Sequence, residues 1–361
     1  MRLRRKLLIA LILLSFPVAV AFAGYWSFHY YVLEPRDPHA PQPVVFDAEL
    51  SKSIQEIARN LEQQGLIRSH LVFRTLARVQ GVDTQIKAGE YELSATMTPQ
   101  QILDKMIRGE MLQRRATIKE GMTLVDISKA LQDAGITDAT SFLAAAYNSD
   151  LLTEEGIAAR SFEGYLFPET YNFRRNTPAR KVIKTMHQQL NDRWSENWMQ
   201  RLTILQMSKH EILTLASIIE KESGNFDEQP VIASVFHNRL QQKMRLQADP
   251  TVIYGIEGFD GNITKRDLLT ETEYNTYVIN GLPPGPIANP GLNAIRSALY
   301  PSNTRFLYFV GDGAGRHVFS ENLSQHNEAV NRYQRGGARR AALNEQPAES
   351  NTADTQNATP P

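Results

Sequence analysis

Residues 215–224 read LASIIEKESG, an apolar helical pattern that contains two glutamates. Ser208 and Glu211 form a capping-box pattern before this segment and Gly224 is a suitable stop after it, so we expect a helix of about four turns. A glutamate beside two isoleucines either has a structural partner or is kept protonated for a chemical purpose. The choice between these roles separates an enzyme from a scaffold.

Glu220 is predicted to lie in the last turn of this helix. Leu213, Ala216 and Ser217 share its face, which is consequently apolar and made of mostly small residues. Burial and the negative end of the helix dipole both disfavour a charged carboxylate, so both raise its pKa. A glutamic acid with a raised pKa is what general-acid catalysis on a glycosidic oxygen requires.

Glu222 follows two residues later, about 200° further around the helix, so the two carboxylates are not expected to face one site. Its row includes Leu215 and Ile218, and the periodicity does not exclude it from a catalytic role. For either glutamate the alternative is an ion pair, for example with Arg239 or Arg245.

The composition is that of a globular chain of 361 residues, with 39 basic and 39 acidic side chains, so no nucleic-acid partner is expected. Cysteine is absent, which excludes thiol catalysis and cysteine-ligated metals. The eight histidines are scattered, and His210 lacks a second histidine at helical spacing. We therefore expect neither a metal site nor a cofactor.

The N-terminal segment Leu7–Phe28 carries no charged side chain and follows a basic cluster. A helix of this length spans about 33 Å, enough for a bilayer core. The basic cluster places residues 1–6 in the cytoplasm, so we expect 7–29 to be a single-pass membrane anchor and the rest of the chain to lie outside. The alternative is a cleaved signal peptide, because Ala21-Phe22-Ala23 resembles a cleavage site.

Composition also divides the rest of the chain. Residues 34–43 are proline-rich and predict a stiff spacer, whereas 335–361 contain few large apolar residues and predict a disordered tail. The folded material between them is predicted to be α+β, with a first module over 44–140 and a second domain over 141–334.

The first module contains a weak internal repeat. Ser53–Leu61 recurs seventy positions later as Thr123–Leu131, with Gly65 and Gly135 at the same offset. Each copy predicts one face of a short helix that ends at its glycine. Small α+β units of this kind are typical either of modules that bind cell-wall glycan or of spacers that position an enzyme.

Several motifs, in order, resemble the MltG (YceG-like) family of endolytic murein transglycosylases. They are Phe162–Tyr171, Leu215–Ser223, Val235–Leu240, Met244–Gly255, Tyr274–Tyr277 and Gly281–Ile287. The resemblance implies a transmembrane helix, a LysM-like α+β module and an α+β YceG-like catalytic domain that ends near residue 333. Ser223 departs from the family pattern, in which threonine is frequent at this position.

The resemblance implies that Glu220, the first glutamate of the Ile-Glu-Lys-Glu run, is the catalytic acid. Such an enzyme uses the C6 hydroxyl of its substrate as nucleophile, so one carboxyl suffices where a hydrolase needs two. Glu220 would protonate the oxygen between MurNAc and GlcNAc and then accept the hydroxyl proton, leaving a 1,6-anhydro-MurNAc end. The implied partners are peptidoglycan glycan strands, the membrane, and peptidoglycan synthases of the elongation or division machinery, and the implied role is to terminate strand elongation.

Polar and aromatic residues of the same motifs are candidates for substrate binding. Gln247 and Asn275 are expected to hydrogen-bond sugar hydroxyls or the acetamido group. The tyrosines that either stack on sugar rings or fill the core are Tyr254, Tyr274 and Tyr277.

The other carboxylates are assigned structural roles. Asp249, which precedes Pro250, is expected to be a helix N-cap rather than a second catalytic group. Glu222 and Glu163 are expected to order the site. Two other functions remain open: a murein hydrolase that uses Glu220 with Asp249 or Glu163 and a water, and a non-catalytic glycan-binding scaffold of the cell-wall synthesis machinery.

Overall fold

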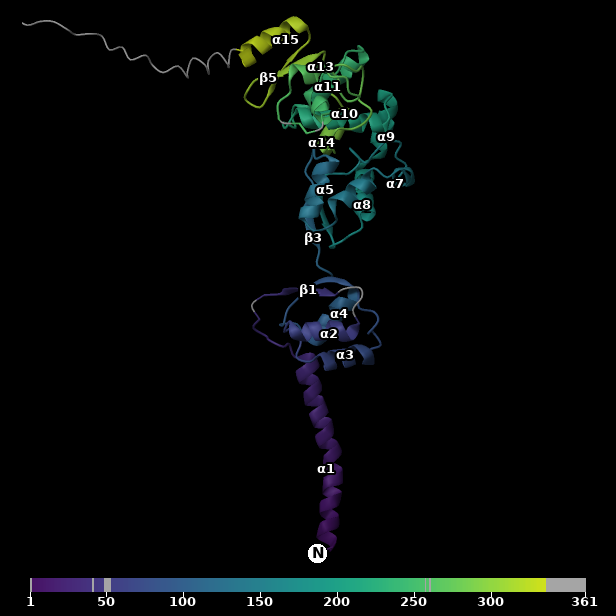
Figure 1. Cartoon of the computed structure of the whole chain (residues 1–361), viewed down its shortest axis with the longest axis vertical. Helices are drawn as coiled ribbons and strands as arrows, with labels where there is room; N and C mark the ends of the chain where they lie inside the picture. The colour runs from purple at the N-terminus through teal and green to yellow at the C-terminus, as the bar shows by residue number, and fades with distance from the viewer. Residues whose placement is uncertain (1, 41, 49–52, 257, 260, 336–361) are drawn as a thin grey trace, which may run out of the picture. The chain divides into compact units, whose positions relative to one another are not determined.

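The computed structural model describes residues 2–40, 42–48, 53–256, 258–259 and 261–335, with side chains from residue 15 to residue 333 (Figure 1). The tail predicted over 335–361 lies, apart from residue 335, outside the described residues. The chain forms two compact units. Unit 1 is the chain up to Ala116 with Leu131–Asp138 and Tyr171–Thr177, and unit 2 is Thr117–Ala130, Ala139–Thr170 and the chain from Pro178 onward. The domain boundary expected after residue 140 stays a prediction.

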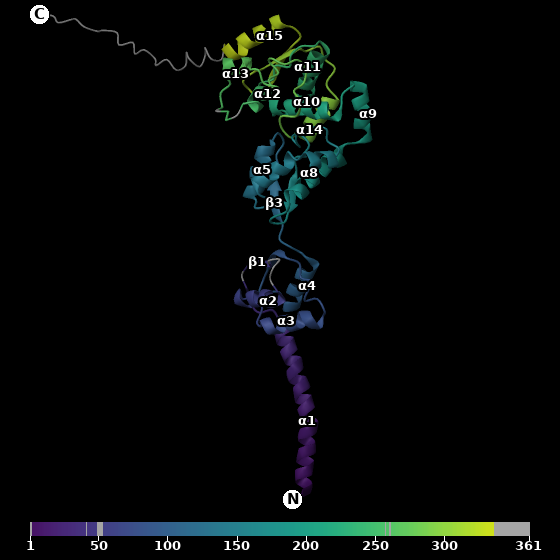
Figure 2. The same cartoon turned by 45° about the vertical axis from the view of Figure 1, so that its right-hand side comes forward.

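Unit 1 is a small α+β assembly at the end of a long helix (Figures 1 and 2). Its elements are α1 (Arg2–Phe28), the π-helical turn η1 (His29–Leu33), β1 (Val44–Ala48), α2 (Ile54–Gln63), α3 (His70–Val79), β2 (Gly89–Leu93) and α4 (Pro99–Arg108). Unit 1 also contains most of β3 (Arg114–Thr117) and of β4 (Thr170–Phe173). Strand β1 pairs antiparallel with β2, and β3 pairs with β4. The buried apolar core includes Val32 of η1, Phe46 of β1 and Leu103 of α4. Among the described residues, no helix combines the length and the apolarity that crossing a bilayer requires.

The two segments of the internal repeat begin and end alike, but most of the second helix lies in unit 2, and their membership of one module stays a prediction. Helix α2 begins after Ser53 and α5 (Leu124–Asp133) begins after Thr123, and each hydroxyl accepts a hydrogen bond from the backbone N–H three residues on. Each helix is followed by a glycine with left-handed backbone, Gly65 at φ 75° and Gly135 at φ 65°. A side chain is strained in this conformation, so the two glycines set where the two helices stop.

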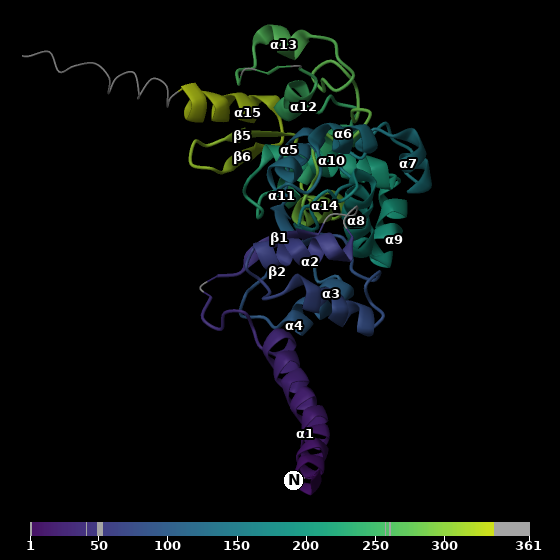
Figure 3. The same ribbon diagram turned by 60° about the horizontal axis from the view of Figure 1, so that its bottom comes forward.

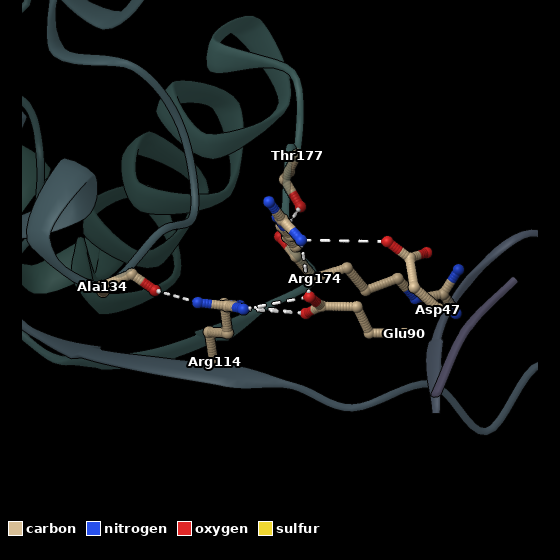
Figure 4. A network of polar contacts seen from close by, with 7 residues as sticks. Asp47, Glu90, Arg114, Ala134, Arg174 and Thr177 are labelled. Carbon is tan, nitrogen blue, oxygen red and sulfur yellow. Dashed lines mark hydrogen bonds and ion pairs between the residues drawn. The ribbon is translucent and has the colours of Figure 1, made fainter. Parts of the chain in front are cut away.

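A network of ion pairs holds the segments of unit 1 together (Figure 4). Glu90 in β2 is buried, and its carboxylate accepts hydrogen bonds from Arg114 at 3.0 and 3.1 Å and from Arg175 at 2.9 Å. Arg114 also donates to the carbonyl of Ala134, and Arg175 lies 3.8 Å from Asp47. Because removing a carboxylate from water is costly, these partners are needed to keep Glu90 in place.

Unit 2 is built around a buried helix, α10. Its elements are α6 (Ala139–Ala146), α7 (Ser149–Glu154), α8 (Ala179–Arg193), α9 (Glu196–Leu205), α10 (Lys209–Glu222), α11 (Gln229–Gln241), α12 (Asp249–Tyr254), α13 (Lys265–Leu269), α14 (Leu292–Leu299), β5 (Tyr308–Gly311), β6 (His317–Ser320), α15 (Leu323–Val330) and the π-helical turn η2 (Asn331–Arg335). The predicted capping box at Ser208 and Glu211 is confirmed. Every residue from Ile212 to Ile219 is buried, because α11, α12 and α14 pack around α10. Figure 3 shows the hairpin of β5 and β6 beside α15.

Candidate active site

Two adjoining cavities of unit 2 share the side chain of Glu222. The first has a volume of about 450 Å³, and Arg239, Asp249 and Tyr277 line it together with Glu222. The second has a volume of about 800 Å³ and extends along the glycine-rich turn between β5 and β6. Gly311 and His317 also line both cavities. The two cavities therefore adjoin at Glu222, and we call them together the Glu222 groove.

Glu222 is the last residue of α10, so the buried helix carries its carboxyl to the groove. Burial and the charge of Asp249 together raise the pKa of Glu222 to about 8, although the charge of Arg239 lowers it. A carboxyl with this pKa is protonated at neutral pH. The end of α10 thus offers a proton donor to whatever occupies the groove.

Arg239 reaches the groove from α11 and is itself buried. Its guanidinium donates hydrogen bonds to the backbone carbonyls of Leu307 at 2.6 Å and Leu246 at 2.7 Å. It also lies 5.1 Å from the centre of the Tyr308 ring. Arg239 therefore holds two backbone segments at the groove, the one before α12 and the one before β5. Its charge lowers the pKa of Glu222, but burial raises that pKa by more.

Asp249 and Tyr277 are bonded to each other in the lining of the first cavity. The Tyr277 hydroxyl donates to Oδ1 of Asp249 at 2.6 Å. The expected N-cap role of Asp249 is wrong by one residue: Ala248 is the N-cap of α12, and Asp249 is its first helical residue. Gln247 also lines the groove and has a left-handed backbone with φ 50°, an unusual conformation for a residue with a side chain.

Glu220 lies in different surroundings and lines neither cavity. Its Oε2 accepts a hydrogen bond from the backbone N–H of Gly291 at 2.9 Å. Burial raises the pKa of Glu220, the Gly291 N–H lowers it, and the charge of Glu120 raises it. The direction of this shift agrees with the sequence argument, but the catalytic role of Glu220 stays a prediction.

Glu163 is the centre of a second buried polar cluster. Its carboxyl accepts hydrogen bonds from the backbone N–H of Leu124 at 3.2 Å, from Asn289 at 2.9 Å and from the hydroxyl of Tyr254 at 3.4 Å. Burial raises the pKa of Glu163, these hydrogen bonds lower it, and the net result is a pKa of about 8. The cluster ties four distant segments of unit 2 together, and an effect of Glu163 on catalysis stays a prediction.

Asn289 belongs to the cluster around Glu163, and the sequence argument missed it. Its side chain is fully buried, and its Oδ1 accepts hydrogen bonds from the N–H groups of Gly164 and Leu166 at 3.0 Å each. These bonds fasten the motif 162–171 to the chain that directly follows the motif 281–287. Both motifs were recognised, but the sequence contains no signal that pairs them.

Three of the predicted substrate-binding residues lie outside the linings of the two cavities. Asn275 is 1% exposed, and its amide donates to the carbonyls of Asp267, Leu268 and Thr270, so it holds its own loop. The rings of Tyr254 and Tyr274 pack against each other with centroids 4.8 Å apart. Within the described residues, no cluster of three or more histidine or acidic side chains has the arrangement of a metal site.

Comparison with known proteins identifies the family. The model of the YceG-like family matches residues 47–332, and the chain therefore belongs to that family. It is 32% identical over 320 residues to the endolytic murein transglycosylase of Bacillus subtilis, covering 84% of this chain and 88% of that protein. Its identity to the endolytic murein transglycosylase of Streptococcus pneumoniae is 29% over 355 residues, covering 88% of this chain and 63% of that protein. A crystal structure of a YceG-like protein from Listeria monocytogenes matches with a TM-score of 0.56 at 33% identity, over 80% of this chain and 99% of that one. The α+β YceG-like fold expected from the motifs is thereby confirmed.

Proposed function

We propose that this protein is an endolytic murein transglycosylase whose general acid is Glu222. The observation that carries the assignment is a carboxyl with a pKa of about 8 at the middle of a groove. Relatives that are named endolytic murein transglycosylases support the activity. Glu220, which the sequence favours, is the competing assignment.

The reaction follows from the protonation state of Glu222. The protonated carboxyl donates its proton to the oxygen between MurNAc and GlcNAc, and the carboxylate formed then accepts the proton of the MurNAc C6 hydroxyl. That hydroxyl oxygen bonds to C1, which leaves a 1,6-anhydro-MurNAc end and consumes no water. Since the substrate supplies its own nucleophile, a second catalytic carboxylate is not required.

The shape of the groove suits cleavage inside a strand. Two cavities adjoin at Glu222, so the groove has room for a glycan that continues past the acid. Gln247 and Tyr277 line the first cavity and are the predicted sugar contacts that we retain. Asn275 is left out of this set because it is buried within its own loop.

The proposed place of action is the outer face of the inner membrane. The uncharged run Leu7–Phe28 after a basic cluster supports a single-pass anchor with a cytoplasmic N-terminus and a periplasmic catalytic unit. We further propose that unit 1 includes a LysM-like module, and that the enzyme acts on nascent strands beside peptidoglycan synthases and terminates their elongation. These proposals rest on the sequence and on the family.

Mass spectrometry of glycan digested by the full-length protein tests the proposed reaction. We expect products that end in 1,6-anhydro-MurNAc. A murein hydrolase that uses Glu222 with Asp249 and a water gives the same fragments, each heavier by one water at the cleaved MurNAc. Binding of glycan with no product at all would contradict any catalytic function and favour the scaffold.

A further inference from the structure

Unit 1 exposes an apolar surface beside the end of α1. Leu71 and Val79 of α3 are 54% and 81% exposed, and Phe28 at the end of α1 is 49% exposed. A cavity of about 360 Å³ lies between Phe28, Val32 and the 71–79 face of α3. We call the surface formed by Phe28, Leu71, Thr75 and Val79 the α3 stripe; Figure 1 shows α3 at the end of α1.

The α3 stripe follows from the helical spacing of its residues. Leu71, Thr75 and Val79 are four residues apart and form one row along α3. A different face of the same helix, with Phe73 and Ala77, is already buried in the core of unit 1. Helix α3 therefore has one apolar face that the core uses and another that it does not.

The charge of this helix indicates which partner covers the free face. Residues 70–79 read HLVFRTLARV and contain no acidic side chain. Arg74 and Arg78 lie within the helix and Arg68 lies just before it. An apolar row with basic residues and no acidic ones is typical of helices that lie in the interface of an anionic bilayer.

The end of α1 is fixed to unit 1 rather than joined by a flexible tether. Val32 is 3% exposed and belongs to the core of unit 1. Arg68 donates hydrogen bonds to the carbonyls of Tyr30 at 2.6 Å and Glu34 at 3.3 Å, and its guanidinium lies 4.1 Å from the centre of the Tyr30 ring. The position of the α3 stripe is consequently set by the position of α1.

We propose that the α3 stripe lies in the outer interface of an anionic phospholipid bilayer, with its apolar side chains among the acyl chains and Arg74 and Arg78 at the phosphates. The proposal rests on the membrane anchor of the proposed function. In this proposal unit 1 binds the membrane surface through α3, so that the anchor and α3 together hold the protein at the bilayer.

The absence of cysteine allows a direct test with single labels. Leu71→Cys and Val79→Cys variants of the full chain carry an environment-sensitive fluorophore in vesicles of phosphatidylglycerol and phosphatidylethanolamine, with or without a doxyl quencher on the lipid. Arg59→Cys, on the exposed side of α2, is the matched control in unit 1, and Val18→Cys reports insertion of α1. We expect lipid-borne quencher to cause a large loss of fluorescence at 18, 71 and 79, but not at 59.

Each other outcome overturns the proposal in a recognisable way. Quenching at 18 with none at 71 and 79 leaves the anchor intact and refutes the α3 stripe alone. No quenching at any position refutes the anchor as well. Labels at 71 and 79 that are shielded from water yet untouched by the lipid quencher indicate that a protein, such as a second copy of the chain, covers the stripe instead.

Discussion

Replacing Asn289 by alanine is expected to destabilise unit 2 strongly. The buried amide donates to the carbonyl of Met122 at 3.0 Å and to Glu163 at 2.9 Å, and accepts from Gly164 and Leu166 at 3.0 Å each. Alanine leaves the last two backbone N–H groups buried without an acceptor, at about 1–3 kcal/mol each. We therefore expect Asn289→Ala to lower the free energy of unfolding by about 2–6 kcal/mol.

Urea unfolding of the full chain in detergent, followed by the fluorescence of Trp194 and Trp198 in unit 2, measures this loss. Asn148→Ala is the matched control, because Asn148 is exposed and makes one capping hydrogen bond, to the N–H of Leu151 at 2.8 Å. The control is expected to cost about 1 kcal/mol. A loss for Asn289→Ala no larger than that of Asn148→Ala would refute the reasoning from buried donors.

Three further predictions concern charged groups. The kcat/KM for glycan cleavage should fall as pH rises above about 8, because Glu222 then loses the proton that it donates, and a flat profile from pH 6 to 10 would argue against this. Folding favours the protonated form of Glu163, whose pKa is raised from 4.5 to about 8, so the free energy of unfolding should decrease as pH rises through this interval; Glu163→Gln should remove part of that slope in urea titrations at several pH values. Glu90→Gln should cost about 1–3 kcal/mol in hydrogen-exchange protection of β2, against about 0.5 kcal/mol or less for the exposed neighbour variant Glu92→Gln; equal losses would show that the ion-pair network is unimportant.

Local signals in the sequence were sufficient for much of the fold. Capping residues and positive-φ glycines act within a few residues, so the ends of α2, α5 and α10 follow from Ser53, Thr123 and the Ser208–Glu211 pair. Long-range pairing is a different matter. The contact between Asn289 and the 162–171 motif joins segments more than a hundred residues apart, and no periodicity encodes it.

The site shows the same limit. Helical periodicity correctly separates Glu220 from Glu222, but cannot say which of the two faces meets a cavity. The position of the cavity depends on where α12 and the β5–β6 hairpin pack. Residues of both line the cavity at Glu222, together with Arg239. The carboxylate of Glu220 instead accepts a hydrogen bond from the backbone N–H of Gly291. The sequence also placed Asp249 near the start of a helix, where it lies. Its hydrogen bond with Tyr277, 28 residues away, could not be foreseen.

The most direct test of the proposed mechanism compares Glu222→Gln with Glu220→Gln. Both are isosteric changes at the end of α10, and circular dichroism checks that both variants fold. The rate of formation of 1,6-anhydro-MurNAc ends is measured on the same glycan. We expect a loss of at least about 100-fold for Glu222→Gln, because the proton donor is removed, and a much smaller change for Glu220→Gln. Anhydro ends that persist in Glu222→Gln and vanish in Glu220→Gln would contradict the assignment and return the acid to Glu220.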